Sequence, residues 1–193
     1  MILLLKYKQS ASIIIFMALS KDHTHNFNRL AYKIRSHHKV QDMKDYIQHG
    51  NVSVYDHVNA VAHTAYSMAH ALKIRVDEKV LIEGALLHDF FGYDWHNDKV
   101  KRKLFDMHGF THARRARERA VKHFHIDRPT QHVIESHMWP LTLRSLPRTR
   151  EAILVCIADK IVSIRETLRI GDRGRFSVSP GRPSDNRIIK NSK

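Results

Sequence analysis

The chain is poor in the residues that cross-link a fold. Its 193 residues include one cysteine, Cys156, which lies in the apolar run AILVCIAD. A single thiol cannot form an intramolecular disulfide, which excludes a disulfide-stabilised secreted scaffold and favours the reducing cytoplasm. The middle of the chain contains neither an internal repeat nor a linker-like stretch. With 42% hydrophobic residues, the sequence therefore predicts one globular domain with terminal extensions.

Long apolar runs are also lacking. The longest one near the N-terminus, residues 13–19, is shorter than the roughly 20 residues that a membrane-spanning helix needs. We therefore expect no transmembrane span, although a weak signal-peptide core is an alternative for this run. The sequence predicts a partly flexible N-terminal extension at residues 1–42 and a helical domain at residues 43–171. Residues 172–193 are rich in Gly, Pro, Ser and Arg, which predicts a disordered basic tail.

Acidic side chains are scarce. The chain has 19 Asp and Glu residues against 33 Lys and Arg residues, which gives a formal net charge of +14. This excess favours an anionic partner such as a phosphate ester, a nucleotide, a nucleic acid or a membrane surface. A solvated basic helix face remains an equally good explanation.

Alternating strand patterns are missing, whereas helical spacing recurs along the chain. Apolar residues follow one another at steps of three and four in the first central segment, at Val54, Val58, Val61, Ala65, Met68 and Leu72. Asp77 is a suitable N-cap for a helix that includes Leu81 and Leu87. Later helices are expected to start near Thr111, near Pro129 and near Pro147. The fold class is therefore all-α, an irregular bundle of five to seven helices.

A His-Asp pair, His88-Asp89, ends one of these apolar runs. With 16 histidines in the chain, chance predicts about one such dipeptide, so the pair alone carries no weight. The position of the pair at the end of an apolar run is more informative, because burying an imidazole or a carboxylate is costly unless a metal ion or hydrogen bonds compensate. Asp159, inside ILVCIADKIVSI, and His57, beside an apolar stripe, raise the same question. Three helices therefore carry potential ligands near their buried sides, which predicts a metal site inside the bundle.

The order of these residues resembles the H…HD…D pattern of the HD-domain superfamily of metal-dependent phosphohydrolases. The contexts HVNAVA, LLHD and ADK are similar too, and the resemblance covers roughly residues 50–170. It implies an HD-type helical bundle. Some members add two histidines between the HD pair and the last aspartate, and His112 and His137 are our candidates, with His108 and His132 as alternatives. The metal ligands implied by the resemblance are His57, His88, Asp89, His112, His137 and Asp159.

The resemblance also implies cofactor and chemistry. Imidazole and carboxylate ligands suit one or two divalent ions of Fe, Mn, Co, Ni or Zn, with Asp89 bridging a second ion. Metal-activated water would then attack phosphorus, with Asp89 and His88 as the catalytic residues. The chain contains no G-x-S-x-G elbow, no P-loop and no convincing cysteine nucleophile, which agrees with this chemistry. The expected substrate is a small phosphorylated molecule, such as a nucleotide.

Four basic residues are candidates for contacts with substrate phosphates, since guanidinium and ammonium groups bind phosphate oxygens. They are Arg114, Arg115, Arg148 and Lys160. Ordinary solvent-facing charge is the alternative for each of them. A non-enzymatic alternative for the whole protein is binding of nucleic acid or of a signalling nucleotide through the basic segment HARRARERAVKH.

Overall fold

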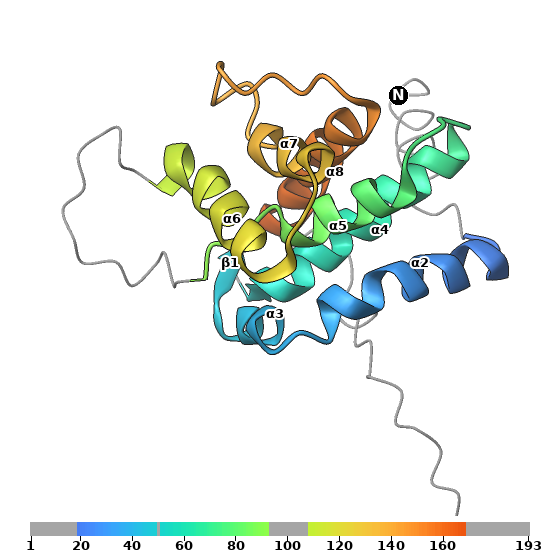
Figure 1. Cartoon of the computed structure of the whole chain (residues 1–193), viewed down its shortest axis with the longest axis horizontal. Coiled ribbons are helices and arrows are strands. Elements are labelled where there is room, and N and C mark those ends of the chain that lie inside the picture. The colour runs from blue at the N-terminus through green and yellow to red at the C-terminus, as the bar shows by residue number, and fades with distance from the viewer. Residues whose placement is uncertain (1–18, 50, 93–107, 169–193) are drawn as a thin grey trace, which may run out of the picture.

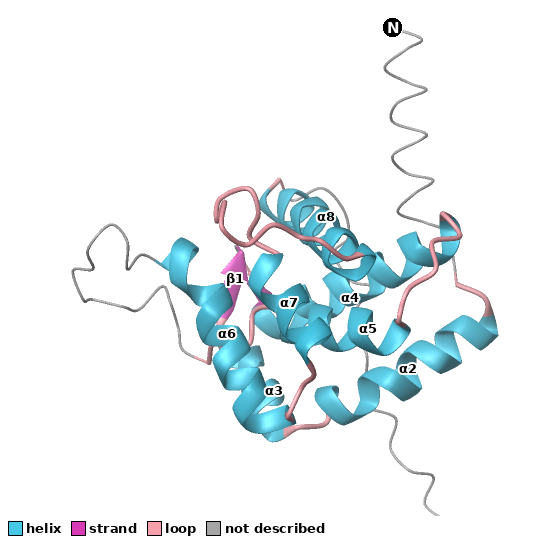
Figure 2. Cartoon of the chain, turned by 45° about the horizontal axis from the view of Figure 1, so that its top comes forward, coloured by secondary structure: helices cyan, strands magenta, loops and turns pink. Residues whose placement is uncertain are grey.

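The structure is a computed structural model that describes residues 19–49, 51–92 and 108–168. Within these residues the chain forms seven α-helices, one short 3-10 helix and a two-stranded antiparallel sheet (Figure 1, Figure 2). The all-α prediction is confirmed, and the small sheet adds to it. The elements are α2 (Lys21–Arg35), α3 (His38–Gln41), η1 (Asp42–Asp45), β1 (Ile47–His49), β2 (Val52–Ser53), α4 (Val54–Ala71), α5 (Glu78–Leu87), α6 (His108–Phe124), α7 (Arg128–Ser136) and α8 (Arg150–Thr167).

Side-chain caps fix where several helices begin. The expected cap Asp77 accepts a hydrogen bond from the Val80 backbone N–H at 3.1 Å, which starts α5. Equivalent caps are made by Ser53 for α4, Asp127 for α7 and Thr149 for α8. Helix α6 begins at His108, three residues before the expected start at Thr111. The local sequence thus fixes where these helices begin, including α4, which carries His57 in its first turn.

The core forms where α4 and α5 pack against each other and against α8 and α7. Gly84 of α5 faces Val133 of α7, and a β-carbon at Gly84 would lie 2.5 Å from Val133 Cγ1. Any larger residue would therefore push these two helices apart. The close approach matters for the site, because His88 and His137 directly follow the last residues of α5 and α7 as their C-caps.

Helix α2 belongs to the same core. Its residues Phe27, Ala31 and Ile34 are buried, and the helix packs against α5 along the lower side of the view in Figure 1. The packed body thus begins before residue 43, where the sequence analysis placed its boundary. Most residues of α2 are polar and exposed, so its narrow apolar face is hard to recognise in the sequence. The remaining parts of the expected extensions, residues 1–18 and 172–193, lie outside the described residues.

No helix in the described ranges is both long enough and apolar enough to cross a bilayer. The lone thiol, Cys156, is buried in α8, where its Sγ donates to the Trp139 carbonyl oxygen at 3.3 Å.

Candidate metal centre

The six residues expected to bind metal come together from five helices. His57 lies in the first turn of α4, His112 near the start of α6 and Asp159 in the middle of α8. His88 and His137 are the C-caps of α5 and α7, and Asp89 follows His88 directly. All six side chains are buried. A buried group of four imidazoles and two carboxylates is costly unless their charges are compensated.

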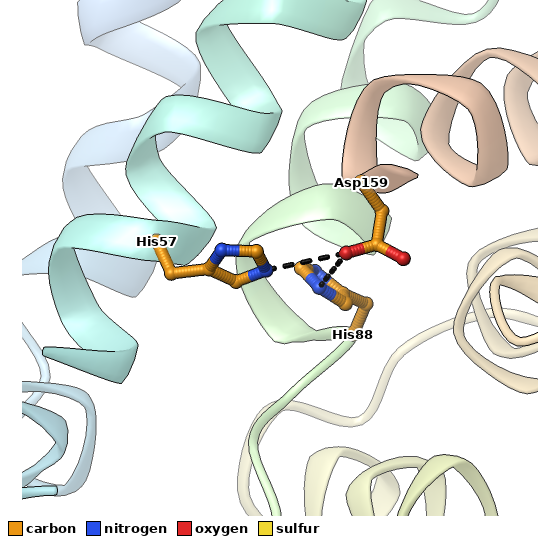
Figure 3. A group of neighbouring side chains, drawn as sticks. All are labelled: His57, His88 and Asp159. Carbon is orange, nitrogen blue, oxygen red and sulfur yellow. Dashed lines mark ion pairs between the residues drawn. The ribbon is translucent and has the colours of Figure 1, made fainter. Parts of the chain in front are cut away.

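Three of these residues form one half of the group. The side chains of His57, His88 and Asp159 point toward one another from α4, α5 and α8 (Figure 3). The Asp159 Oδ1 atom lies 3.3 Å from His57 Nε2 and 3.8 Å from His88 Nε2. The Asp89 Oδ2 atom completes this half at 3.8 Å from His57 Nε2 and 3.4 Å from His88 Nε2. Two histidines and two carboxylates thus face one point.

The other oxygen of Asp89 faces a second histidine pair. Asp89 Oδ1 lies 3.4 Å from His112 Nε2 and 3.6 Å from His137 Nε2, and these two nitrogens are 3.0 Å apart. The carboxylate of Asp89 therefore lies between two pairs of imidazoles, with one oxygen toward each pair. The alternative His132 is placed elsewhere, since its Nε2 accepts a hydrogen bond from the Arg148 backbone N–H at 3.1 Å. The side chain of His108 lies outside the described residues.

Hydrogen bonds orient the rings from behind. The Nδ1 atoms of His88 and His137 lie 2.7 Å from the carbonyl oxygens of Ala85 and Ile134, three residues earlier in each chain segment. A carbonyl oxygen only accepts, so each Nδ1 must carry the hydrogen, and Nε2 is the atom that faces the group. These carbonyls lie in the last turns of α5 and α7, where a helix leaves carbonyls without intrahelical partners. The helix ends thus set the ring orientation.

Two polar residues of this centre were not anticipated from the sequence. The Nδ1 of His57 lies 2.9 Å from Glu166 Oε2, and the Gln48 amide Nε2 donates to Asp89 Oδ2 at 2.7 Å. Glu166 follows Asp159 by seven residues, two helical turns, so helical periodicity could have placed it on the same face of α8. Gln48 comes from β1, and a strand of three residues carries no comparable periodic signal.

The electrostatics of the group follow from burial and ion pairing. Burial by itself raises the pKa of Asp89 and of Asp159, but the neighbouring histidines outweigh it and hold both pKa values below the usual range. Burial lowers the pKa of His57, yet its bonds to Asp159 and Glu166 raise that pKa to about 10. Burial, reinforced by His88, lowers the pKa of His137 to about 3. The carboxylates thus stay ionised and attract positive charge to the centre.

The residues fit a divalent transition-metal ion. Two sets of three ligand atoms lie within 4.8 Å of one another, one from His57, His88 and Asp159 and one from His88, Asp89 and His137. Two buried ligand atoms, His88 Nε2 and Asp89 Oδ1, have no hydrogen-bond partner in the described part of the chain. A mixture of imidazole nitrogens and carboxylate oxygens suits Fe, Mn, Co, Ni or Zn better than Ca or Mg.

The four candidate phosphate-binding residues have different surroundings. Arg114 is exposed and lies 3.9 Å from Glu118 on the surface of α6. Arg148 is exposed and lines a surface depression together with His132. Arg115 is half-buried, one turn after His112 on α6. The Lys160 ammonium donates to the His137 carbonyl at 2.9 Å and lies 3.9 Å from Asp159 Oδ2.

Four aromatic residues follow the His-Asp pair, and the structure describes two of them. Phe90 and Phe91 are buried in the core, which agrees with core packing rather than contact with a ligand. The guanidinium of Arg119 lies over the Phe90 ring, 4.8 Å from its centre. Tyr93 and Trp95 lie outside the described residues.

Comparison with known proteins agrees with this geometry. A model of the HD domain family matches residues 54–163, more than half of the chain and all six grouped residues. The chain therefore belongs to the HD domain family, whose members are generally hydrolases that bind divalent metal ions. No curated protein and no solved structure matches the chain. Gln48 and Glu166 lie on either side of the matched segment.

Proposed function

We propose that the protein is a metal-dependent phosphohydrolase that cleaves a phosphate ester or phosphoanhydride of a small molecule, such as a nucleotide. The placement of Asp89 is the observation that carries this proposal. Its Oδ2 faces His57 and His88, whereas its Oδ1 faces His112 and His137. A carboxylate that offers one oxygen to each of two imidazole pairs is suited to bridge two ions.

Each side chain has a defined task in this proposal. His57, His88 and Asp159 would hold one ion with Asp89 Oδ2, and His112 and His137 would hold a second with Asp89 Oδ1. Bound metal ions supply an activated water molecule and stabilise negative charge on phosphoryl oxygens. The protein keeps Asp89 ionised and presents Nε2 of His88 by holding its Nδ1–H on the Ala85 carbonyl.

No side-chain nucleophile is required. Cys156 is buried and its thiol donates to a backbone carbonyl, so it is not placed to attack a substrate. Arg115 and Lys160 are the basic residues that we propose for contact with substrate phosphate, since they lie beside proposed ligands. Arg115 follows His112 by one helical turn, and the Lys160 ammonium lies 3.9 Å from Asp159. We place the activity in the cytoplasm, because the single cysteine is free.

The nucleic-acid alternative rests on the basic helix α6. Two arginines of this helix already have acidic neighbours, since Arg117 pairs with Glu135 at 2.9 Å and Arg114 lies 3.9 Å from Glu118. These pairs reduce the positive charge that the helix would offer to a phosphate backbone. A small phosphorylated substrate at the buried ligand group is therefore the better supported reading.

A direct experiment combines metal analysis with activity. The purified protein is stripped of metal, loaded separately with Mn, Fe, Co or Ni, and offered a panel of nucleotides and simple phosphate esters. We expect about one to two ions per chain and phosphate release with at least one metal. Protein that stays metal-free after loading, or binds metal but hydrolyses nothing on the panel with any of the four, would contradict the proposal.

A further inference from the structure

The ring of His57 is held on both sides by carboxylates of one helix. Its Nε2 lies 3.3 Å from Asp159 Oδ1, and its Nδ1 lies 2.9 Å from Glu166 Oε2. Asp159 and Glu166 are seven residues apart on α8, so two helical turns place both on the face that packs against α4. The Glu166 side chain is 12% exposed, which is low for a glutamate at the end of a helix.

His57 needs such an acceptor because of its place in its helix. His88 and His137 end their helices and use free backbone carbonyls of the last turn. His57 lies in the first turn of α4, where the backbone carbonyls accept from N–H groups four residues later. The free backbone groups at this end of a helix are N–H donors, which cannot hold an Nδ1–H. An acceptor must therefore come from another element.

We propose that Glu166 is a positioning residue for the metal centre: it accepts the Nδ1–H of His57 and thereby fixes His57 Nε2 as the atom that binds metal. This inference rests on the proposed function, since it assigns Glu166 a role toward the same ions. Carboxylate–histidine pairs of this kind fix the tautomer and the ring orientation of metal-binding histidines and strengthen them as ligands. Glu166 lies beyond the matched residues 54–163, so the family match does not assign it.

The inference predicts a graded loss of metal affinity. Glu166→Ala removes the acceptor, and we expect the affinity for Zn²⁺ and for Co²⁺ to fall by about 10- to 100-fold. Glu166→Gln keeps an oxygen that can accept from Nδ1–H but loses the charge, so a smaller loss is expected. Glu151→Gln is the matched control on α8. Its carboxylate lies at the opposite end of α8 from Glu166 and accepts from the Asp77 backbone N–H at 2.9 Å. The Zn²⁺ and Co²⁺ affinities of this variant should equal those of the unaltered protein.

The experiment measures binding of Zn²⁺ and Co²⁺ to the full chain by competition with a chelator. In parallel, nitrogen-15 NMR of the Zn²⁺-loaded protein reports which His57 nitrogen carries hydrogen. We expect a protonated, slowly exchanging Nδ1 in the unaltered protein and a faster exchanging one in Glu166→Ala. A purely structural role would lower stability without changing this signal. If Glu166→Ala does not fold, as judged by circular dichroism, Glu166→Gln carries both measurements.

The outcomes separate the two proposals. If the unaltered protein binds neither ion, the metal centre and the role of Glu166 both fail. If it binds Zn²⁺ and both Glu166 variants bind equally well with the same His57 signal, only the role of Glu166 is overturned. A graded loss that spares Glu151→Gln supports both.

Discussion

Replacement of Gly84 by alanine tests the packing that brings the proposed metal ligands together. The added β-carbon would lie 2.5 Å from Val133 Cγ1 and 2.8 Å from Val133 Cβ. Since non-bonded carbons are most stable at about 3.5–4.0 Å, α5 and α7 must move apart by roughly 1 Å. Overpacking of this kind costs about 1–3 kcal/mol. A rotamer change cannot move Val133 Cβ out of this clash, so the cost lies in the upper part of that range. The better helix propensity of alanine returns up to about 1 kcal/mol, which leaves an expected net loss of about 1–2 kcal/mol.

Urea denaturation followed by circular dichroism measures this loss as a lower midpoint at unchanged slope. Truncation of the opposing residue provides the control, because Val133→Ala removes the nearer of the two contacts. The loss of unfolding free energy in the double variant should be smaller than the sum of the two single losses by at least about 0.5 kcal/mol. A Gly84→Ala protein as stable as the unaltered one, or additive costs in the double variant, would refute the close-packing argument.

The same substitution should weaken metal binding. His88 and His137 end the two helices that would separate, and their ring centres lie 4.7 Å apart. A ligand displaced by about 1 Å no longer fits the short bonds that transition metals require, roughly 2.0–2.3 Å. We therefore expect Gly84→Ala to lower Zn²⁺ affinity as well as stability, by the same chelator competition. An unchanged Zn²⁺ affinity would show that metal binding does not depend on the close contact between α5 and α7.

Three further substitutions test separate parts of the structure. Asp89→Ala should abolish hydrolysis and lower the metal content per chain while the helical circular dichroism signal is retained; activity equal to the unaltered protein would show that the site is misassigned. Gln48→Ala removes the amide that donates to Asp89 Oδ2, and phosphate-release assays should show a smaller loss than for Asp89→Ala. Asp127→Ala removes the cap of α7 and should cost about 1 kcal/mol of unfolding free energy. The hydrogen bonds from Thr130 lower the pKa of Asp127, so this contribution is present above the unfolded-state pKa near 4 and is lost as the pH falls below it. Urea midpoints that differ between the two proteins by the same amount at pH 7 and at pH 3 would contradict it.

The grouping of candidate ligands followed from a physical argument about apolar helices. His57, His88, Asp89 and Asp159 are polar residues on apolar helix faces, and the cost of burying such groups predicted that they would meet. The structure brings them together with His112 and His137. The cap at Asp77 was equally accessible, because capping depends on a few adjacent residues.

Other parts of the centre were not readable from local pattern. Gln48 reaches Asp89 from a short strand, and neither strand is long enough to show an alternating pattern. Glu166 looks like one of the ordinary charged residues at the end of a helix until its distance from Asp159 is counted in turns. Helix α2 falls within the extension expected at residues 1–42, and its buried residues Phe27, Ala31 and Ile34 are separated by polar ones.

The position of each proposed ligand within its helix explains where its orienting partner comes from. A histidine at the C-terminal end of a helix finds a free carbonyl in its own last turn, as His88 and His137 do. His57, at the opposite end of its helix, depends on Glu166 of α8, and Asp89 receives its hydrogen bond from Gln48 of β1. The segment that matches the HD family thus holds all six proposed ligands, whereas two of their orienting partners come from its flanks. A fragment limited to residues 54–163 would keep the ligands but lose these partners, together with the buried face of α2. The proposed metal centre therefore depends on the whole packed body rather than on the matched segment alone.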